Sequence, residues 1–370
     1  MPSPPAASPR VHHADGLRAV AALWVFLFHI SQATYLDRLR AQLPGALNAM
    51  LFDHGVLGIA IFFVLSGFVV ALAAGPGAAS PPSFGAFLMR RLVRLTPPYY
   101  ASIAATLALM AAWAIWSSGP VRWPSQASIV AHLLYLQDAF GFPEINGVYW
   151  TLVVELQFYA LYALLTLLAQ RVAPASKQHG ARIAMFAVSA GVSMFVATGD
   201  LPAPAWFGNM AQSWCAFAAG VLGGWAWTQG GAAVWASRGV IAAFALLALS
   251  GPPHATGYFI VSALTAVVLS EARLLGPLPG WLASTPLRRL GAVSYSFYLL
   301  HAPLMFLGFG IVHHLLPPSA AADLVGLAAS LAICLVASAA MQRWVEAPSQ
   351  RWSRRIGPHG ALRRPVLAER

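Results

Sequence analysis

The sequence contains few charged residues. Only 9% of its 370 residues are Asp, Glu, Lys or Arg, whereas 59% belong to the hydrophobic set, and the mean hydropathy is +0.67. A soluble globular domain carries about a quarter charged residues, which it needs to cover its surface. Disordered chains are poor in apolar and aromatic residues, so the same numbers also exclude disorder. The composition therefore predicts a protein whose main solvent is lipid.

Cysteine is also scarce. The two cysteines, Cys215 and Cys334, both lie inside apolar runs of the sequence. Such a position is typical of a buried thiol rather than of a disulfide pair. An acyl-carrying thiol is the alternative interpretation.

Long polar segments are absent as well, and apolar runs fill most of the chain. A membrane-spanning helix needs about 20 mostly apolar residues. The sequence therefore predicts an all-α polytopic membrane protein with about ten transmembrane helices. We place them at residues 17–36, 56–74, 96–116, 148–169, 182–199, 206–228, 237–252, 255–271, 290–316 and 321–344. We expect an N-terminal tail over residues 1–14, a transmembrane domain over 15–348 and a basic tail over 349–370.

The positive charge has a one-sided distribution in this scheme. The formal net charge is +11, and an even number of spans puts both termini on one side of the membrane. All 22 Lys and Arg residues fall on that side except Arg38, Arg40 and Arg122. Because Lys and Arg collect in cytoplasmic loops, we expect cytoplasmic termini and a multi-pass protein of the inner (plasma) membrane. The charge then records orientation, and we expect no nucleic-acid partner.

Three ionisable residues lie deep inside the predicted spans. Ionisable groups are costly there and usually mark a functional site. At 1.5 Å per residue, His29 lies about 16 Å beyond Arg18, Glu155 about 10 Å into the fourth span and His301 about 15 Å into the ninth. The pattern predicts that His29, Glu155 and His301 reach similar depth. The alternative is that each only forms a hydrogen bond between helices.

A basic segment precedes the third predicted span. Arg90, Arg91 and Arg94 would share one face if the segment were helical, and such a face can clamp a phosphate. Simple anchoring of the chain at the cytoplasmic surface is the alternative. In the first span, Asp15 is expected to cap the helix and Arg18 to reach lipid phosphate or a ligand.

Several familiar chemical motifs are missing. The sequence has no GxSxG nucleophile elbow and no Walker-type phosphate loop. The adjacent histidines at 12–13 and 313–314 lack the i, i+4 spacing of a helical zinc site. We therefore expect neither a metal nor a permanently bound cofactor.

Six short motifs follow one another along the chain. They are Asp15-Gly16-Leu17-Arg18 with His29, Phe62-Phe63-Val64-Leu65-Ser66-Gly67-Phe68, Arg91-x-x-Arg94 with Pro97, Trp150-Thr151-Leu152-x-x-Glu155-x-Gln157-Phe158-Tyr159, Ser294-Tyr295-Ser296-x-Tyr298-Leu299-x-His301, and Glu346-x-Pro348. In this order, from Asp15 to about Pro348, they resemble the motifs of the membrane-bound acyltransferase-3 family, which O-acylates bacterial surface glycans and some small molecules. The chain departs from that pattern at Ile59-Ala60, where the family often has Leu/Asp, and at Val154, where it often has a second Glu.

The resemblance implies an integral-membrane O-acyltransferase. It would move an acyl group, expected to be acetyl, from cytoplasmic acyl-CoA to a hydroxyl of an extracytoplasmic or membrane-linked glycan. The family comparison also implies the stand-alone form, without the extracytoplasmic esterase-like domain of some members. The acceptor, the acyl length and the oligomeric state stay open.

The resemblance also suggests roles for individual residues. Arg18, Arg91 and Arg94 would bind the phosphates of CoA. His29 would act as general base, with Glu155 or His301 orienting it, although an acyl-histidine intermediate is also possible. The residues expected to bind substrate or shape the site are Trp150, Tyr159, Ser294 and Tyr298.

Two other functions fit the buried ionisable groups. The acceptor could be a small molecule or a lipid instead of a glycan. Alternatively, the same groups could form the proton relay of a proton-coupled transporter or export factor without acyl chemistry.

Overall fold

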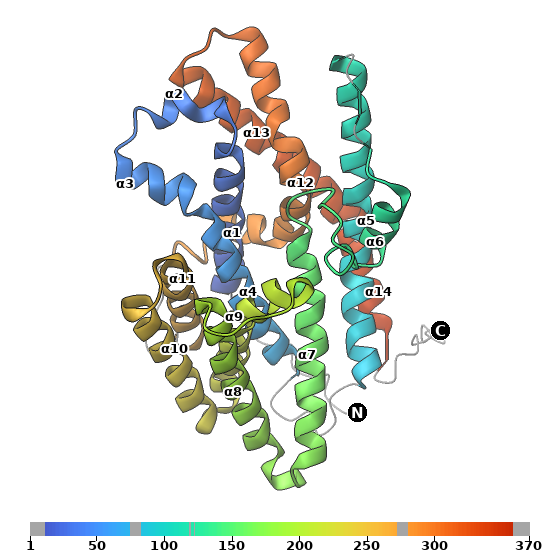
Figure 1. The fold of residues 1–370 in the computed structure, drawn as a ribbon. Helices are drawn as coiled ribbons and strands as arrows, with labels where there is room; N and C mark the ends of the chain where they lie inside the picture. The colour runs from blue at the N-terminus through green and yellow to red at the C-terminus, as the bar shows by residue number, and fades with distance from the viewer. Residues whose placement is uncertain (1–11, 75–82, 118–119, 122, 272–279, 358–370) are drawn as a thin grey trace, which may run out of the picture.

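The computed structural model describes residues 12–74, 83–117, 120–121, 123–271 and 280–357. Within these ranges the chain is helical and has no strand (Figure 1). The long helices are α1 (His12–Ser31), α4 (Gly58–Ala74), α5 (Phe84–Ser117), α7 (Trp150–Val172), α8 (Gln178–Thr198), α9 (Ala205–Gln229), α10 (Ala232–Ser250), α11 (Pro253–Ser270), α12 (Thr285–Leu315) and α13 (Ala320–Met341). The short helices are α2 (Asp37–Arg40), α3 (Gly45–Asn48), α6 (Gln126–Leu133) and α14 (Ala347–Arg355).

The prediction of an all-α protein with about ten spans is confirmed. In the described part of the chain, nine helical segments are long and apolar enough to cross a membrane. Helix α9 is not among the nine, because its sequence mixes glycine and polar residues with the apolar ones. Its residues from Ser213 to Trp225 are nevertheless buried without a break. This helix is therefore surrounded by protein rather than by lipid.

Helix α4 packs closely along α9 in the middle of the molecule. A Cβ atom placed on Gly67 would overlap the carbonyl oxygen of Phe217, and one on Gly220 would overlap that of Val64. Two glycines facing each other's backbone are typical of helices that associate closely in membranes. The glycine of the second motif, Gly67, thus has a packing role.

Helix α5 differs from the predicted third span. The prediction began at residue 96, whereas the helix begins at Phe84. The basic segment with Arg91 and Arg94 therefore forms the first turns of α5 and is not a loop. At 1.5 Å per residue, a helix of 34 residues is about 51 Å long, more than the hydrocarbon thickness.

Two prolines interrupt the hydrogen bonding of α5 at Pro97 and Pro98. Proline lacks an N–H group, so the carbonyl four residues earlier loses its helical partner. The hydroxyl of Ser349 donates instead to the carbonyl of Arg94, at 3.0 Å. The hydroxyl of Tyr295 donates to the next carbonyl, that of Leu95, at 2.8 Å. The carbonyl freed by Pro98 thus ties α5 to α14, and the separate bond to Leu95 ties it to α12, both next to Arg94.

The helices at both ends extend into the segments predicted as tails. Helix α1 begins at His12, so Asp15 lies inside its first turn and the prediction that Asp15 caps the helix is wrong. At the other end, residues Gln342–Glu346 form a π-helical turn that leads into α14. The first residues of the predicted tail are therefore helical and pack against α5. Residues 1–11 and 358–370, which include most of the two predicted tails, lie outside the described residues.

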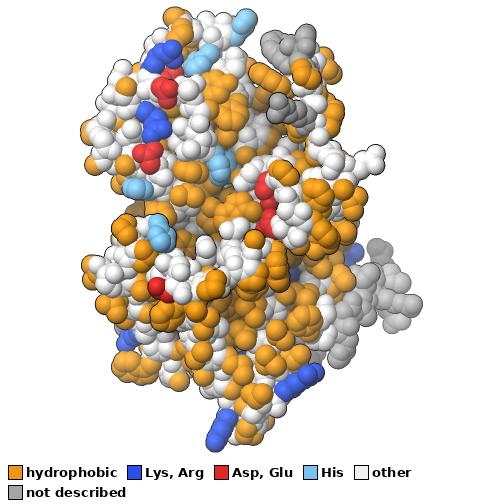
Figure 2. Space-filling view, in the orientation of Figure 1, with side chains coloured by type: hydrophobic (Ala, Val, Ile, Leu, Met, Phe, Trp, Pro, Cys, Tyr) orange, Lys and Arg blue, Asp and Glu red, His pale blue; other side chains and the backbone are white. Residues whose placement is uncertain are grey.

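The surface agrees with a membrane location. Hydrophobic side chains cover most of the face seen in Figure 2, whereas Lys, Arg, Asp and Glu gather in a few places. Fully exposed apolar side chains such as Ile115, Leu249 and Val336 are 83%, 88% and 72% accessible. In water such a surface would be a large interaction patch, but lipid covers it without cost.

Candidate active site

A cavity of about 130 Å³ lies among helices α1, α4, α5, α7, α9 and α12. One carboxylate and three guanidinium groups line this cavity, together with hydroxyl groups and aromatic rings. Its lining consists of Arg18, Ile59, Phe62, Phe63, Leu65, Ser66, Val69, Arg91, Arg94, Leu95, Thr151, Leu152, Glu155, Tyr159, Phe217, Ser294, Tyr295 and Tyr298. The structure thus brings the predicted arginines Arg18, Arg91 and Arg94 together.

The arginines leave positive charge in the cavity. Arg18 donates to Asp15 at 3.0 Å, so its charge has a partner. The guanidinium of Arg91 lies over the ring of Tyr159, 4.8 Å from its centroid. Among the residues that the structure describes, no carboxylate lies within ion-pair distance of Arg91 or Arg94. A cavity lined by two such guanidinium groups is suited to an anion, because guanidinium binds phosphate or carboxylate oxygens through paired hydrogen bonds.

The start of α1 is held by close contact with the start of α12. A Cβ atom on Gly16 would overlap the backbone carbonyl of Leu282, and one on Gly291 would overlap that of Asp15. The glycine of the first motif therefore lets α1 approach this part of the chain. This contact fixes Arg18, one half-turn further along, at the wall of the cavity.

Glu155 belongs to this cavity. Its Oε1 accepts a hydrogen bond from Ser66 Oγ at 2.9 Å and another from the hydroxyl of Tyr159. The Ser66 and Tyr159 hydroxyl oxygens are 3.3 Å apart. Glu155 therefore joins α4 to α7 beside the arginines, and its hydrogen-bond partners do not include a histidine.

The two predicted catalytic histidines meet each other instead. His29 Nδ1 lies 3.1 Å from His301 Nε2, and the ring centroids are 5.1 Å apart. His301 is fully buried, with its ring parallel to that of Phe297. His29 is partly accessible. Both histidines lie outside the lining of the arginine cavity. Of the three residues predicted to reach similar depth, the two histidines therefore pair with each other, and Glu155 lies apart from them in the cavity.

The backbone partners define the proton positions in the neutral pair. His301 Nδ1 lies 2.8 Å from the carbonyl of Tyr298, which can only accept, so this nitrogen carries the proton. His301 Nε2 is then an acceptor for His29 Nδ1, which also lies 3.1 Å from the carbonyl of Val25. His29 therefore carries its proton on Nδ1. Its Nε2 is left as an unprotonated nitrogen with no hydrogen bond to the described residues, which is the state that a general base requires.

A proline in α12 fixes the position of this pair. Pro303 has no N–H to bond the carbonyl of Leu299, four residues earlier. Ser102 Oγ and Asn146 Nδ2 donate to that carbonyl at 3.0 and 3.3 Å. The segment of α12 that carries His301 is thus clamped by α5 and by the segment before α7.

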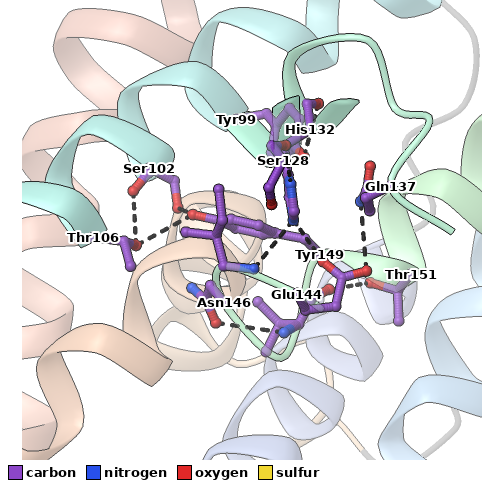
Figure 3. A network of polar contacts seen from close by, with 12 residues as sticks. Tyr99, Ser102, Thr106, Ser128, His132, Gln137, Glu144, Asn146, Tyr149 and Thr151 are labelled. Atoms are coloured by element: carbon purple, nitrogen blue, oxygen red, sulfur yellow. Dashed lines mark hydrogen bonds and ion pairs between the residues drawn. The ribbon is translucent and has the colours of Figure 1, made fainter. Parts of the chain in front are cut away.

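A polar network that sequence reasoning missed supports this clamp (Figure 3). His132 is fully buried, its Nε2 accepts from the backbone N–H of Ile145 at 3.1 Å, and the same atom lies 3.4 Å from Glu144 Oε2. The hydroxyl of Tyr149 lies 2.7 Å from Ser102 Oγ. The sequence offered a signal here, because a histidine and a glutamate lie in a short segment between two spans.

The residues expected to shape the site have different positions. Tyr159, Ser294 and Tyr298 line the arginine cavity, whereas Trp150 packs at the edge of the apolar core and does not line it. Sequence reasoning did not single out Ser66, Thr151 and Tyr295 as site residues. All three lie within the quoted motifs, so their polar character inside apolar helices was the available signal.

The last motif has a structural position. Glu346 is buried in the π-helical turn, where its carboxylate accepts from Ser296 Oγ at 2.6 Å and from Gln350 Nε2 at 2.9 Å. Through Ser296 it ties α14 to α12. The same helix α14 supplies Ser349 to the carbonyl of Arg94, so this motif supports the arginine side of the cavity.

Comparison with known proteins agrees with this geometry. The acyltransferase-3 family model, described as an acyltransferase domain, matches residues 11–339. The chain is 28% identical to the acyltransferase MdmB of Streptomyces mycarofaciens over 97% of both chains. No solved structure matches the chain.

Two further relatives match over a smaller share of their own length. A Bacillus subtilis protein whose name describes a peptidoglycan O-acetyltransferase (YrhL) is 25% identical over 79% of this chain. The match covers 48% of that relative, so the chain spans about half its length. A Komagataeibacter xylinus protein named as a membrane-bound transacylase (BcsY) is 27% identical over 78% of this chain and 71% of its own.

These matches cover nearly the whole region that carries the cavity and the histidine pair. They identify an enzyme rather than a transporter without acyl chemistry. The chain belongs to the acyltransferase-3 family and is a multi-pass membrane acyltransferase.

Proposed function

We propose that the protein is an O-acyltransferase that takes its acyl group from acyl-CoA in the arginine cavity and delivers it to a glycan hydroxyl activated by His29. The observation that carries this proposal is the pair of adjoining sites, one lined by three arginines and one with a free histidine nitrogen. An anionic donor needs a cationic binding site, and a hydroxyl acceptor needs a base that removes its proton. Acetyl is the acyl group we expect.

The donor end rests on Arg91 and Arg94. CoA carries several phosphate groups, and guanidinium is the side chain best suited to hold them. Arg18 adds a third guanidinium, although Asp15 partly compensates it. In a cytoplasmic-termini orientation this end faces the compartment that contains acyl-CoA.

The chemistry needs only groups of this chain and the two substrates. His29 Nε2 removes the proton of the acceptor hydroxyl while the hydroxyl oxygen attacks the thioester carbonyl. The C–S bond then breaks, CoA leaves as a thiolate, and the proton on His29 passes to the sulfur. General base catalysis of this kind contributes about 10²–10⁴-fold. His301 positions the ring of His29 by accepting a hydrogen bond from its Nδ1–H group.

A glycan is the acceptor class we favour. The name of the Bacillus relative describes transfer of acetyl groups to peptidoglycan, a polymer rich in hydroxyl groups on the outer side of the membrane. The hydroxyl of a small molecule or a lipid would use the same base. The same assay distinguishes these acceptors from a glycan when each is supplied in turn.

The donor assignment is tested by acetyl-CoA binding to the purified protein. We expect the Arg91→Ala/Arg94→Ala variant to bind acetyl-CoA at least tenfold more weakly, since charge-assisted hydrogen bonds contribute about 1.5–3 kcal/mol each. Arg90→Ala is the matched control on the same helix. Arg90 donates to the carbonyl of Ile356 at 2.9 Å and does not line the cavity. Equal affinities in the double variant, the control and the wild type would contradict the donor site.

The transfer reaction is tested in inside-out vesicles that enclose peptidoglycan fragments and are supplied with labelled acetyl-CoA from outside. We expect label on the fragments with the wild type and none above background with His29→Gln at equal expression. Full transfer by His29→Gln would exclude the assigned base. Label on lipid instead of on the fragments would replace the glycan acceptor by a lipid one.

A further inference from the structure

The arginine cavity and the histidine pair are separated by two aromatic side chains, Phe62 of α4 and Tyr298 of α12. Both rings line the cavity. They meet edge to face with their centroids 5.7 Å apart. The ring of Tyr298 also lies 5.6 Å from the ring of His301. An acyl group held by a donor in the cavity therefore meets these two rings before it can reach the histidines.

Phe62 occupies the boundary between two parts of the core. It packs against the large apolar cluster around the cavity and also against the smaller one that contains Phe26 and Phe297. The rings of Phe26 and Phe297 are in turn the neighbours of His301. Phe62 is thus in contact with the surroundings of both sites.

Tyr298 is held in place at both ends. Its hydroxyl lies 3.0 Å from Thr151 Oγ1 of α7, which also lines the cavity. Its carbonyl accepts the Nδ1 proton of His301. Displacement of Tyr298 would therefore disturb the histidine pair. Phe62 has no such polar tie, since a phenyl ring forms none, and it is the more easily displaced half of the barrier.

We propose that Phe62 and Tyr298 form a partition between the donor cavity and the base, and that Phe62 determines which acyl groups pass and keeps water from the thioester. This inference rests on the proposed function, because it assumes an acyl-CoA donor in the cavity. With the partition closed, the thioester carbonyl and His29 are separated until the acyl group displaces Phe62. A smaller side chain at position 62 opens this passage permanently.

The partition has a measurable consequence in the absence of acceptor. Water then reaches the thioester carbonyl beside His29, its oxygen adds to the carbonyl carbon, the C–S bond breaks, and the products are a free carboxylic acid and CoA thiol. The released thiol is measured with purified full-length protein and acetyl-CoA or octanoyl-CoA as probes. Acetyl-CoA binding is measured on the same samples.

We expect Phe62→Ala to bind acetyl-CoA within about twofold of the wild type and to release CoA at least tenfold faster, with a larger increase for octanoyl-CoA than for acetyl-CoA. The double variant Phe62→Ala/His29→Gln should lose the increase, because the water needs the same base. Phe68→Ala is the matched control, since Phe68 is a buried phenylalanine on the same helix that does not line the cavity. It should not raise acceptor-free release.

Several results would overturn the inference. Unchanged CoA release by a Phe62→Ala protein that binds acetyl-CoA normally would do so, as would an equal increase with Phe68→Ala or an increase that survives His29→Gln. If Phe62→Ala does not fold, Phe62→Leu replaces it. We then expect a smaller increase in CoA release, and an absence of any increase would overturn the partition. A wild-type protein that does not bind acetyl-CoA overturns the donor assignment itself, and this outcome is separate from those of the variants.

Discussion

The arrangement of the histidine pair predicts that His301 acts by orienting His29. We consider the substitution His301→Phe, which keeps a planar ring between Phe26 and Phe297 but removes the nitrogen that accepts from His29 Nδ1. In the variant, the Nδ1 proton of His29 retains only the carbonyl of Val25 at 3.1 Å. The ring of His29 is then held by one hydrogen bond instead of two.

The expected magnitude follows from the state of His29 during the reaction. The ring becomes positively charged when it takes the acceptor proton, and a hydrogen bond to a charged group contributes about 1.5–3 kcal/mol. Because about 1.4 kcal/mol corresponds to a tenfold change in rate, His301→Phe should lower kcat roughly 10- to 150-fold. Acetyl-CoA binding should stay within about threefold, since His301 does not line the donor cavity.

The assay is steady-state acyl transfer from labelled acetyl-CoA, with kcat and KM for the donor measured separately. His301→Gln is the conservative variant, because its amide oxygen can accept from His29 Nδ1, and it should recover a large part of kcat. Glu155→Gln is the comparison from the other site. Its effect should fall on KM for acetyl-CoA, because Glu155 contacts Ser66 and Tyr159 and not His29.

Two results would refute this reasoning. A wild-type kcat for His301→Phe would mean that His29 needs no second partner. A fall in kcat for Glu155→Gln as large as that for His301→Phe would mean that the glutamate also acts on the base, as the sequence left open.

Three other perturbations follow from the structure. Tyr159→Leu removes the ring under Arg91 and should raise KM for acetyl-CoA by roughly 2- to 30-fold at unchanged kcat, since a cation–π contact contributes about 0.5–2 kcal/mol. Tyr159→Phe keeps the ring and loses only the hydroxyl that bonds Glu155, so it should raise KM less than Tyr159→Leu. Gly220→Ala forces α4 and α9 apart and should lower the free energy of unfolding by about 1–3 kcal/mol. Gly239→Ala, which has open space around its Cβ position, should leave the stability unchanged or raise it. Equal melting temperatures for both variants would contradict the close crossing. Burial, and to a smaller extent the Glu144 carboxylate, raise the pKa of Asp138 to about 6. The folded protein therefore binds more protons at Asp138 than the unfolded one and loses stability as the pH rises from about 4 to about 6. Asp138→Asn should raise the melting temperature at about pH 7.5 and leave it unchanged at about pH 3, and a gain independent of pH would refute this origin.

The helices were largely predictable because lipid imposes a simple rule. Every spanning segment must satisfy its own backbone and must be apolar over about 20 residues, so composition and length locate it. Helix α5 escaped this rule at its start. Its first turns contain Arg91 and Arg94, and a hydropathy pattern cannot distinguish an amphipathic extension from a loop.

The site was predictable only as a set of residues. Motif order identified the arginines, the two histidines and Glu155, and the structure places Arg18, Arg91 and Arg94 on one cavity. Depth along a helix is a one-dimensional quantity, which cannot say which helices are neighbours. That is why the sequence grouped Glu155 with the histidines, whereas the packing puts it beside the arginines.

The sequence by itself determined the solvent of this protein, the number of long helices and the chemical inventory of the site. These depend on composition and on spacing along the chain, which need no knowledge of neighbours. The tertiary structure alone decided how the inventory is divided. The crossing of α4 with α9 and the carbonyls freed by the prolines of α5 and α12 set which side chains meet, so that the arginines line one cavity and the histidines pair outside it. Packing in three dimensions sets such contacts, and no periodicity in the chain encodes them.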